Sequence, residues 1–392
     1  MKDEKKLDLV LERFYNRYNK FNTKVLETLG ETIKQFDGLT PSEAHKLSQT
    51  LKYNTEIDQL LNELSRLSGK SVQELDELFD RVAKENVGFA EEYYLIQGKD
   101  FIPYEENDQL RRYVETVKKE TYGTFKNLSK SRNIGFTYKQ DNKIIFKPFK
   151  KAYRELIDEA VYKVSTGVID YQSAMRNTIK QLADSGIKVH EETTTYKSGY
   201  NRRIDSSVRQ NVLEGIRRIN IGIQEEVGKE FGADGVEVSF HVPCAEDHWF
   251  INGQQYSKKE FEKINGDLDR PVGTLNCRHF VFSIVLGVNQ PEYSKEYIRK
   301  MRQQSKEKIE YDGKKYTPYE MSQLMRKIET SIRRNKDEQI MARSSGNNEL
   351  ISKAQKNISA LTYKYNEVSK VSGLPTYKNR LYVSQYHRVS TK

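Results

Sequence analysis

The chain has 392 residues, with 66 Lys and Arg against 56 Asp and Glu, and a net charge of +10 at pH 7. This length allows two or three domains with buried cores, and the lack of a run of about 18 apolar residues excludes a membrane-spanning helix. The charged N-terminus lacks the apolar segment of a signal peptide. Two cysteines among many lysines indicate a reducing compartment rather than a disulfide framework.

The positive charge is unevenly distributed along the chain. Residues 292–392 hold 22 Lys and Arg against 11 Asp and Glu, so the whole excess lies in the last quarter. A basic field of this kind suits a phosphate backbone or an acidic protein surface. A solvated, lysine-rich helical surface with interleaved glutamates is the alternative that the sequence leaves open.

Residues 1–132 predict a helical N-terminal domain. Apolar residues recur at three- and four-residue steps over 7–33, the period of an amphipathic helix. Capping boxes at 40–43 (Thr-Pro-Ser-Glu) and 71–74 (Ser-Val-Gln-Glu) predict two further helix starts. Another apolar stripe runs over 110–125. We interpret the many Tyr and Phe of these stripes as core residues rather than as a platform on which bases stack.

Residues 133–291 predict a central α+β domain. Its first part contains a hairpin over 136–146 that turns at Asp-Asn. Two helices follow, at about 148–166 and 170–185, and then a threonine-rich stretch over 189–200 that forms a strand or a loop.

The second part of this domain begins with the clearest helix of the chain, at 208–231, which Gly232 ends. Alternating apolar residues then predict a strand at 236–240, which places His241 at the end of its polar face. A cysteine–histidine stretch follows over 241–279, and an apolar run at 280–286 predicts a buried strand.

Residues 292–392 predict a basic helical C-terminal arm. A hairpin turn at 311–316 precedes a capping box at 317–320, which opens a basic helix. A polar break at 344–348 separates this helix from a last one at 350–371. Positions seven apart on the basic helix lie on nearly the same face. The candidate DNA-contacting residues on this helix are Arg326, Lys327, Arg333, Arg334 and Lys336.

Both cysteines and three of the six histidines lie in the stretch 241–279. Thiol and imidazole are ligands that zinc prefers. The candidate ligands are Cys244, His248, Cys277 and His279, with His241 or Asp247 as a spare. The first pair would share one face of a helical turn, and the second pair would point the same way in an extended segment. One interpretation of this stretch is therefore a structural zinc site.

Two other interpretations of this stretch stay open. In one, the two cysteines are small buried hydrophobic residues and the histidines make ordinary hydrogen bonds. In the other, Asp247, His248, Cys277 and His279 form a metal-dependent nuclease or a Cys–His nucleophilic site. The chain lacks a Walker-type phosphate loop and the H-E-x-x-H and G-x-S-x-G motifs, so we do not expect an enzyme.

Over residues 189–382 the chain resembles the phage minor capsid protein 2 family, which is related to head morphogenesis proteins of tailed phages. The motifs that carry the resemblance occur in order along the chain. They lie at 199–209, at 232–241, at His248 with Trp249, at Asn276-Cys277-Arg278-His279, at 287–291 and at 311–320.

The resemblance implies a structural minor head protein, located in the virion by the portal inside the capsid and in the host cytoplasm during assembly. It implies roles in head assembly, DNA packaging or DNA delivery. The implied partners are the portal protein, the scaffold or major capsid protein, and double-stranded DNA without sequence preference. A plain non-specific DNA-binding protein is the second alternative, beside the nuclease.

Overall fold

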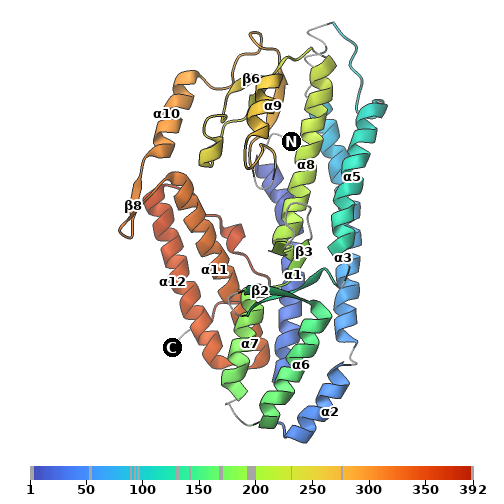
Figure 1. Cartoon of the computed structure of the whole chain (residues 1–392), viewed down its shortest axis with the longest axis vertical. Coiled ribbons are helices and arrows are strands. Elements are labelled where there is room, and N and C mark those ends of the chain that lie inside the picture. The colour runs from blue at the N-terminus through green and yellow to red at the C-terminus, as the bar shows by residue number, and fades with distance from the viewer. Residues whose placement is uncertain are drawn as a thin grey trace.

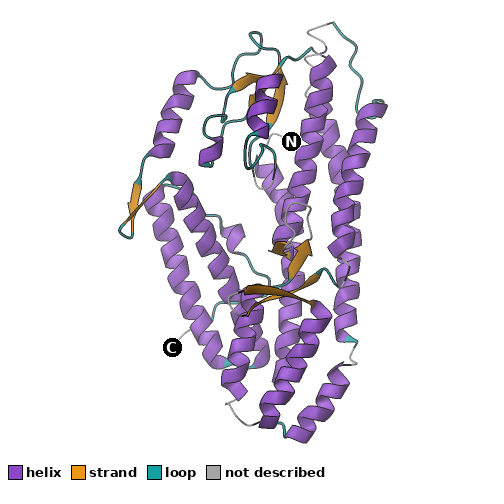
Figure 2. Ribbon diagram, in the orientation of Figure 1, coloured by secondary structure: helices purple, strands orange, loops and turns teal. Residues whose placement is uncertain are grey.

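The structure is a computed structural model of the chain. It describes residues 4–52, 55–88, 91, 94, 98–128, 130, 132–140, 143–166, 171–191, 200–230, 232–274 and 277–389. The fold is mainly helical with small antiparallel sheets, which confirms the predicted α+β, mostly helical class (Figure 2). The Asp141–Asn142 turn, the 192–199 stretch, Phe231 and Asn276 lie outside the described residues.

Long helices run side by side through much of the molecule (Figure 1). They are α1 (Glu4–Lys34), α3 (Glu56–Gly88), α5 (Asp108–Leu128) and α8 (Ile204–Glu230). Helix α1 packs against α8, and α3 packs against both α5 and α8. The predicted stripe of α1 is buried, with Phe14, Tyr18 and Phe21 each at most 2% exposed. The short helix α2 (Pro41–Lys52) begins at the predicted capping box, where Thr40 and Glu43 bond each other.

The helix start predicted at Ser71 is wrong, because α3 continues through that position. The Ser71 hydroxyl donates back to the Leu67 carbonyl at 2.8 Å, four residues earlier in the same helix. The Glu74 carboxylate accepts two hydrogen bonds from Arg17, at 2.5 and 2.7 Å, so it does not cap a helix. Both residues of the pattern therefore join α3 to α1.

A four-stranded antiparallel sheet has the order β2-β1-β3-β4. Its strands are β1 (Ile134–Gln140), β2 (Lys143–Pro148), β3 (Lys188–Glu191) and β4 (Tyr200–Arg203). The predicted hairpin is thus confirmed as the β1–β2 pair. The predicted helices are confirmed as α6 (Phe149–Thr166) and α7 (Tyr171–Ser185). Strand β4 leads directly into α8, which begins at Ile204, four residues before the predicted start.

A second, three-stranded sheet lies beside α8 at one end of the molecule (Figure 1) and has the order β6-β5-β7. Strands β5 (Gly235–Val238) and β7 (Val281–Ile284) confirm the two predicted strands, although β7 was expected to be buried and is half-buried except at Ile284. Strand β6 (Gln255–Ser257) and helix α9 (Lys258–Gly266) were not predicted. The sequence does carry a signal for α9, since Ser257 and Glu260 form a complete capping box.

The C-terminal quarter consists mainly of helices. They are α10 (Lys295–Lys306), α11 (Pro318–Ser345), α12 (Asn348–Ser372) and the short η2 (Lys378–Leu381), with a hairpin of β8 (Ile309–Tyr311) and β9 (Lys314–Tyr316) before α11. Thr317 caps α11 as predicted, and Gly346 ends it at a φ of 78°, in the left-handed region that glycine favours.

Helix α11 packs against both α12 and α1. The largest hydrophobic cluster therefore takes residues from all three predicted ranges, including Met341 and Ala342 of α11. The division of the chain at 132 and 291 into three domains stays a prediction.

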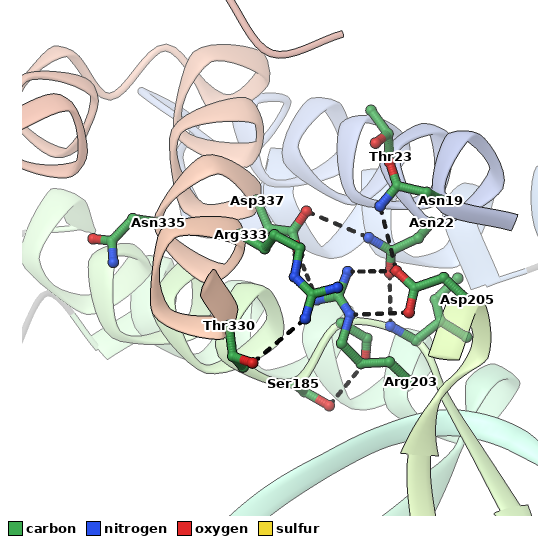
Figure 3. A network of polar contacts seen from close by, with 12 residues as sticks. Asn19, Asn22, Thr23, Ser185, Arg203, Asp205, Thr330, Arg333, Asn335 and Asp337 are labelled. Atoms are coloured by element: carbon green, nitrogen blue, oxygen red, sulfur yellow. Dashed lines mark hydrogen bonds and ion pairs between the residues drawn. The ribbon is translucent and has the colours of Figure 1, made fainter. Parts of the chain in front are cut away.

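A buried polar network connects α11 to the rest of the molecule (Figure 3). The Arg203 guanidinium lies 2.6 Å from Asp337 Oδ2 on α11 and 3.2 Å from Asp205 Oδ2 on α8. Both carboxylates are fully buried. Two asparagines of α1 complete the network, because Asn19 donates to Asp205 at 3.3 Å and Asn22 donates to Asp337 at 3.5 Å. The C-terminal helices are therefore joined to the core and do not form a free arm.

Candidate functional site

The cysteine–histidine stretch leaves β5 and is folded around one asparagine, Asn252. Its side chain accepts a hydrogen bond from the His241 backbone N–H and donates to the His241 carbonyl, both at 2.9 Å. A single-turn 3-10 helix over Glu246–His248 then places His248, which is buried. Asn252 is itself only 2% exposed, so this pairing fixes the path of the chain from β5.

Three ligand-type side chains converge on one point in this loop region. The ligand atoms of His248, Cys277 and His279 all lie within 4.8 Å of one another. The Cys277 Sγ is 3.3 Å from His279 Nδ1 and 3.7 Å from His248 Nδ1. We call these three residues the Cys–His group.

The hydrogen bonds of the two imidazoles set their orientation. His248 Nε2 lies 2.7 Å from the Arg270 carbonyl oxygen, and His279 Nε2 lies 3.1 Å from Asn252 Oδ1. Both partners are acceptors, so each Nε2 carries a proton, and in the neutral ring each Nδ1 presents a lone pair. Histidines that bind metals have this arrangement, with the second ring nitrogen held by a carbonyl or a similar acceptor.

Burial and mutual contacts shift the protonation of the group. Burial lowers the pKa of His279 to about 2, so its imidazole is neutral at pH 7. Burial also opposes ionisation of Cys277, but hydrogen bonds from a protonated His248 and from backbone groups outweigh it and lower the pKa of this thiol. Burial opposes protonation of His248, but the same contact and the Arg270 carbonyl outweigh it and raise the pKa of His248, so a metal ion at Nδ1 would replace that proton. Neutral imidazole and thiolate are the protonation states that bind a metal.

The spacing of the group fits a zinc-type ion. In a tetrahedral site with Zn–S of about 2.3 Å and Zn–N of about 2.0–2.1 Å, sulfur and nitrogen lie about 3.5 Å apart. The two observed sulfur–nitrogen distances, 3.3 and 3.7 Å, lie on either side of this value. The group supplies three ligands, and a fourth position remains.

The spare ligand predicted from the sequence, His241, lies next to this group. Its ring is 4.2 Å from that of His279, between centroids, and its Nε2 is buried with no hydrogen-bond partner among the described residues. The other spare, Asp247, instead makes two hydrogen bonds to Arg270, at 2.6 and 3.0 Å. The group thus offers nitrogen and sulfur, whereas Mg²⁺ prefers oxygen ligands.

Cys244 does not belong to the group. Its buried thiol accepts a hydrogen bond from Asn252 Nδ2 at 3.4 Å, and burial raises its pKa to about 12. The predicted helical turn from Cys244 to His248 is absent, because Ala245 is extended, with φ of −68° and ψ of 152°. Cys244 therefore behaves as the small buried residue of the alternative interpretation, and the other three predicted ligands come together.

The five predicted DNA-contacting residues all lie on α11 but differ in their surroundings. Arg326, Lys327 and Arg334 are exposed. Arg333 donates to the Tyr15 hydroxyl at 2.7 Å, and Lys336 donates to the Leu381 carbonyl at 2.5 Å. Three of the five residues are therefore exposed to a partner, and the other two are half-buried and bonded within the chain.

Two residues that orient the group, Asn252 and Arg270, were not predicted from the sequence. Neither belongs to a ligand type for zinc, and each acts from a position 22 or more residues away from the histidine it contacts. An asparagine directly before Gly253, where φ is 71°, indicates a tight turn but no role in orienting a histidine.

The described helices include none that combines the length and the apolar character needed to cross a membrane. A family model described as phage minor capsid protein 2 matches residues 3–368. No curated protein and no solved structure matches the chain. Because the family match covers nearly the whole sequence, well beyond the stretch that carries the resemblance, the chain belongs to the phage minor capsid protein 2 family, whose members are structural components of the phage virion with other capsid proteins as partners.

Proposed function

We propose that this protein is a portal-associated minor head protein on the inside of the capsid, where it aids head assembly, DNA packaging or DNA delivery and contacts the packaged DNA without sequence preference. The observation that supports the DNA contact is the exposed basic surface of α11. Arg326, Lys327 and Arg334 are exposed within a quarter of the chain that holds the whole positive excess. Such residues neutralise phosphates regardless of base sequence.

A salt titration tests the DNA contact. Each phosphate that a cation neutralises contributes about −0.9 to the slope of log K against log salt concentration. Replacing Lys327 and Arg334 by alanine should flatten the slope by about two units and weaken two unrelated duplexes alike. The matched control replaces Lys353 and Lys356, which are exposed on α12 and carry the same charge. Affinity that is independent of salt, or a tenfold preference for one duplex, would contradict the proposal.

Cross-linking of purified heads tests the location. If the protein lies at the portal, cross-links to portal subunits should dominate over those to the major capsid protein. The copy number of the Lys327→Ala, Arg334→Ala variant in heads separates two uses of the basic surface. A variant that binds DNA normally but fails to enter heads would show that this surface docks on a capsid protein, and the DNA contact would be wrong.

We further propose that the Cys–His group holds one structural zinc ion, with His248, Cys277 and His279 as ligands and His241 as the nearest fourth. The ion would join the loop after β5 to the segment before β7. Mutation tests this assignment against Cys244. Cys277→Ser should lose bound zinc and lower the melting temperature, whereas Cys244→Ser should keep zinc near one equivalent.

The zinc content per chain is measured by metal analysis of protein purified without chelator. A zinc content below about a tenth of an equivalent in the unmodified protein would reject the metal, because a closed tetrahedral site holds zinc too tightly to lose it during purification. A different substitution, His279→Ala, tests the enzyme alternative. Nicking of plasmid DNA in Mg²⁺ or Zn²⁺ that disappears in His279→Ala would favour a nuclease and contradict a purely structural role.

A further inference from the structure

A cavity of about 380 Å³ lies where α1, α8, α11 and η2 meet the segment before β7. The cavity is lined by a cluster of arginines. This cluster cannot be recognised in the sequence, because its arginines come from positions far apart along the chain. Its arginines are Arg202, Arg209, Arg278, Arg326, Arg333 and Arg380. Its acidic residues are Asp8, Glu12 and Glu329.

Part of this charge is already paired. Arg209 lies 3.6 Å from Asp8, and Arg333 donates to Tyr15. Glu329 accepts a hydrogen bond from Tyr365 at 2.8 Å and is buried. Six guanidinium groups against three carboxylates leave an excess of three positive charges around the cavity.

Three of the arginines have no such partner. Among the described residues, the guanidinium groups of Arg278, Arg326 and Arg380 form neither a hydrogen bond nor an ion pair, although Arg380 lies over the Tyr377 ring at 3.7 Å. They also repel one another. Although Arg326 is partly exposed, desolvation by the surrounding residues lowers its pKa, and Arg380 and Arg278 lower it further against the opposing effect of Glu329.

Arg209 faces the same three arginines from α8. Burial lowers the pKa of Arg209 to about 10, and although Asp8 opposes this shift, Arg380, Arg278 and Arg326 add to it. Four guanidinium groups that face one another in this way destabilise the empty cavity, unless an anion lies between them.

We propose that this cavity binds a phosphate group through Arg209, Arg278, Arg326 and Arg380. The planar fork of a guanidinium donates two parallel hydrogen bonds to a phosphate. A phosphate monoester carries about −1.5 to −2 charges at pH 7 and so matches the excess better than one carboxylate does. The cavity volume is within the range of small-ligand sites, about 300–1,000 Å³.

This proposal goes beyond the DNA contact on α11, because it assigns a separate site with other residues. It shares only Arg326 with that surface. A second cavity, of about 420 Å³, is lined by the Cys–His group and by Arg278, Arg326 and Arg380. The phosphate site therefore adjoins the candidate metal site, because the two cavities share these three arginines.

Thermal unfolding of the full-length protein tests the proposal, with inorganic tripolyphosphate as the probe and chloride at matched ionic strength as the reference. Tripolyphosphate should raise the melting temperature in a saturable way, since a ligand that binds only the folded state stabilises it. Arg278→Gln and Arg380→Gln should each weaken binding at least tenfold, because a charge-assisted hydrogen bond is lost. Arg112→Gln, an exposed arginine of α5, is the control and should bind normally.

A second readout separates a binding site from a structural role. In buffer without multivalent anions, Arg380→Gln should melt at or above the temperature of the unmodified protein, because one repelling charge is gone. A structural role predicts a lower melting temperature there. The proposal is overturned if tripolyphosphate gives no rise beyond that of chloride, or if both glutamine variants bind it as tightly as the unmodified protein.

Competition identifies where the phosphate comes from. A single-stranded oligonucleotide with a 5′-phosphate that competes with tripolyphosphate, and loses affinity in Arg278→Gln, would assign the site to nucleic acid. Competition by inorganic phosphate or a nucleotide alone would assign it to a small phosphate compound. A glutamate-rich peptide that binds more tightly than any phosphate would overturn the proposal in favour of an acidic protein partner. Lys327→Ala, Arg334→Ala should leave tripolyphosphate binding unchanged, so failure of the DNA contact and failure of this site are distinguishable.

Discussion

Replacing Arg203 by methionine should strongly destabilise the protein, because it leaves two buried carboxylates without their shared cation. Asp205 and Asp337 are both 0% exposed, and Arg203 is 8% exposed. Removing one partner from a buried ion pair costs about 3–5 kcal/mol. We expect a loss within this range at pH 7, since methionine fills most of the volume and adds little cavity cost.

The two carboxylates should respond differently to the loss of Arg203. Burial opposes ionisation of Asp205, but Arg203 and hydrogen bonds hold its pKa down at about 2. Burial raises the pKa of Asp337 even with Arg203 present. Without the cation Asp337 should take up a proton most readily, so the deficit of Arg203→Met should shrink as the pH falls from 7 towards 4.

Urea denaturation gives the measurement, followed by circular dichroism and by the fluorescence of the single tryptophan, Trp249. The double variant Arg203→Met, Asp337→Asn removes the cation and one carboxylate together. It should therefore be less destabilised than the sum of its single variants, by at least about 1.5 kcal/mol. Arg112→Met, on the exposed face of α5, is the matched control. A loss below about 1 kcal/mol for Arg203→Met, or additive single variants, would refute this account of the network.

Three further predictions concern other parts of the molecule. Gly222→Ala should lower the free energy of unfolding by about 1–3 kcal/mol. The added Cβ would lie 2.1 Å from the Tyr113 ring, whose hydroxyl is bonded to the α8 backbone. In the same urea titration the control Gly69→Ala on α3, which has open space around its Cβ, should be neutral or stabilising. Burial lowers the pKa of Lys336 from 10.5 to about 8, so between these pH values the folded chain binds fewer protons than the unfolded chain. The free energy of unfolding should therefore rise with pH in this range. Measured at pH 7.5 and 9.5, the increase should be smaller for Lys336→Met than for the unmodified protein. Asn252→Ala should lower zinc affinity about 10–100-fold in a chelator competition, because His279 loses the acceptor that orients it.

The sequence predicted most elements because their signals are local. Apolar stripes with a helical period identified α1, α5 and α8, and alternation identified β5. Capping boxes gave the starts of α2 and α11. The same pattern failed at Ser71, because a capping box is informative only where the chain enters a helix, and here the apolar stripe continues past it.

The metal ligands were predictable only in part. Cys277 and His279 flank one residue in an extended segment, so alternation alone brings them together, as their 3.3 Å contact shows. The link between Cys244 and His248 depended on a helical turn that Ala245 interrupts. Nothing local to His248 indicates that it meets Cys277, 29 residues later, because that contact depends on the pairing of β5 with β7.

The sequence predicted how much positive charge the protein carries, but not where in the fold that charge gathers. Charge counting directed attention to α11 as a continuous face, yet Arg333 and Lys336 are bonded to α1 and to η2. A cluster of positive charge instead forms where α8, η2 and the segment after Cys277 meet α11. Its four arginines, Arg209, Arg278, Arg326 and Arg380, lie 48 or more positions apart along the chain. Placing like charges side by side in a partly desolvated cavity lowers stability unless something outside the chain compensates. If the protein lies inside the head, as proposed above, packaged DNA would surround this cluster with phosphates, and the arrangement that costs stability in the isolated chain would favour binding after assembly.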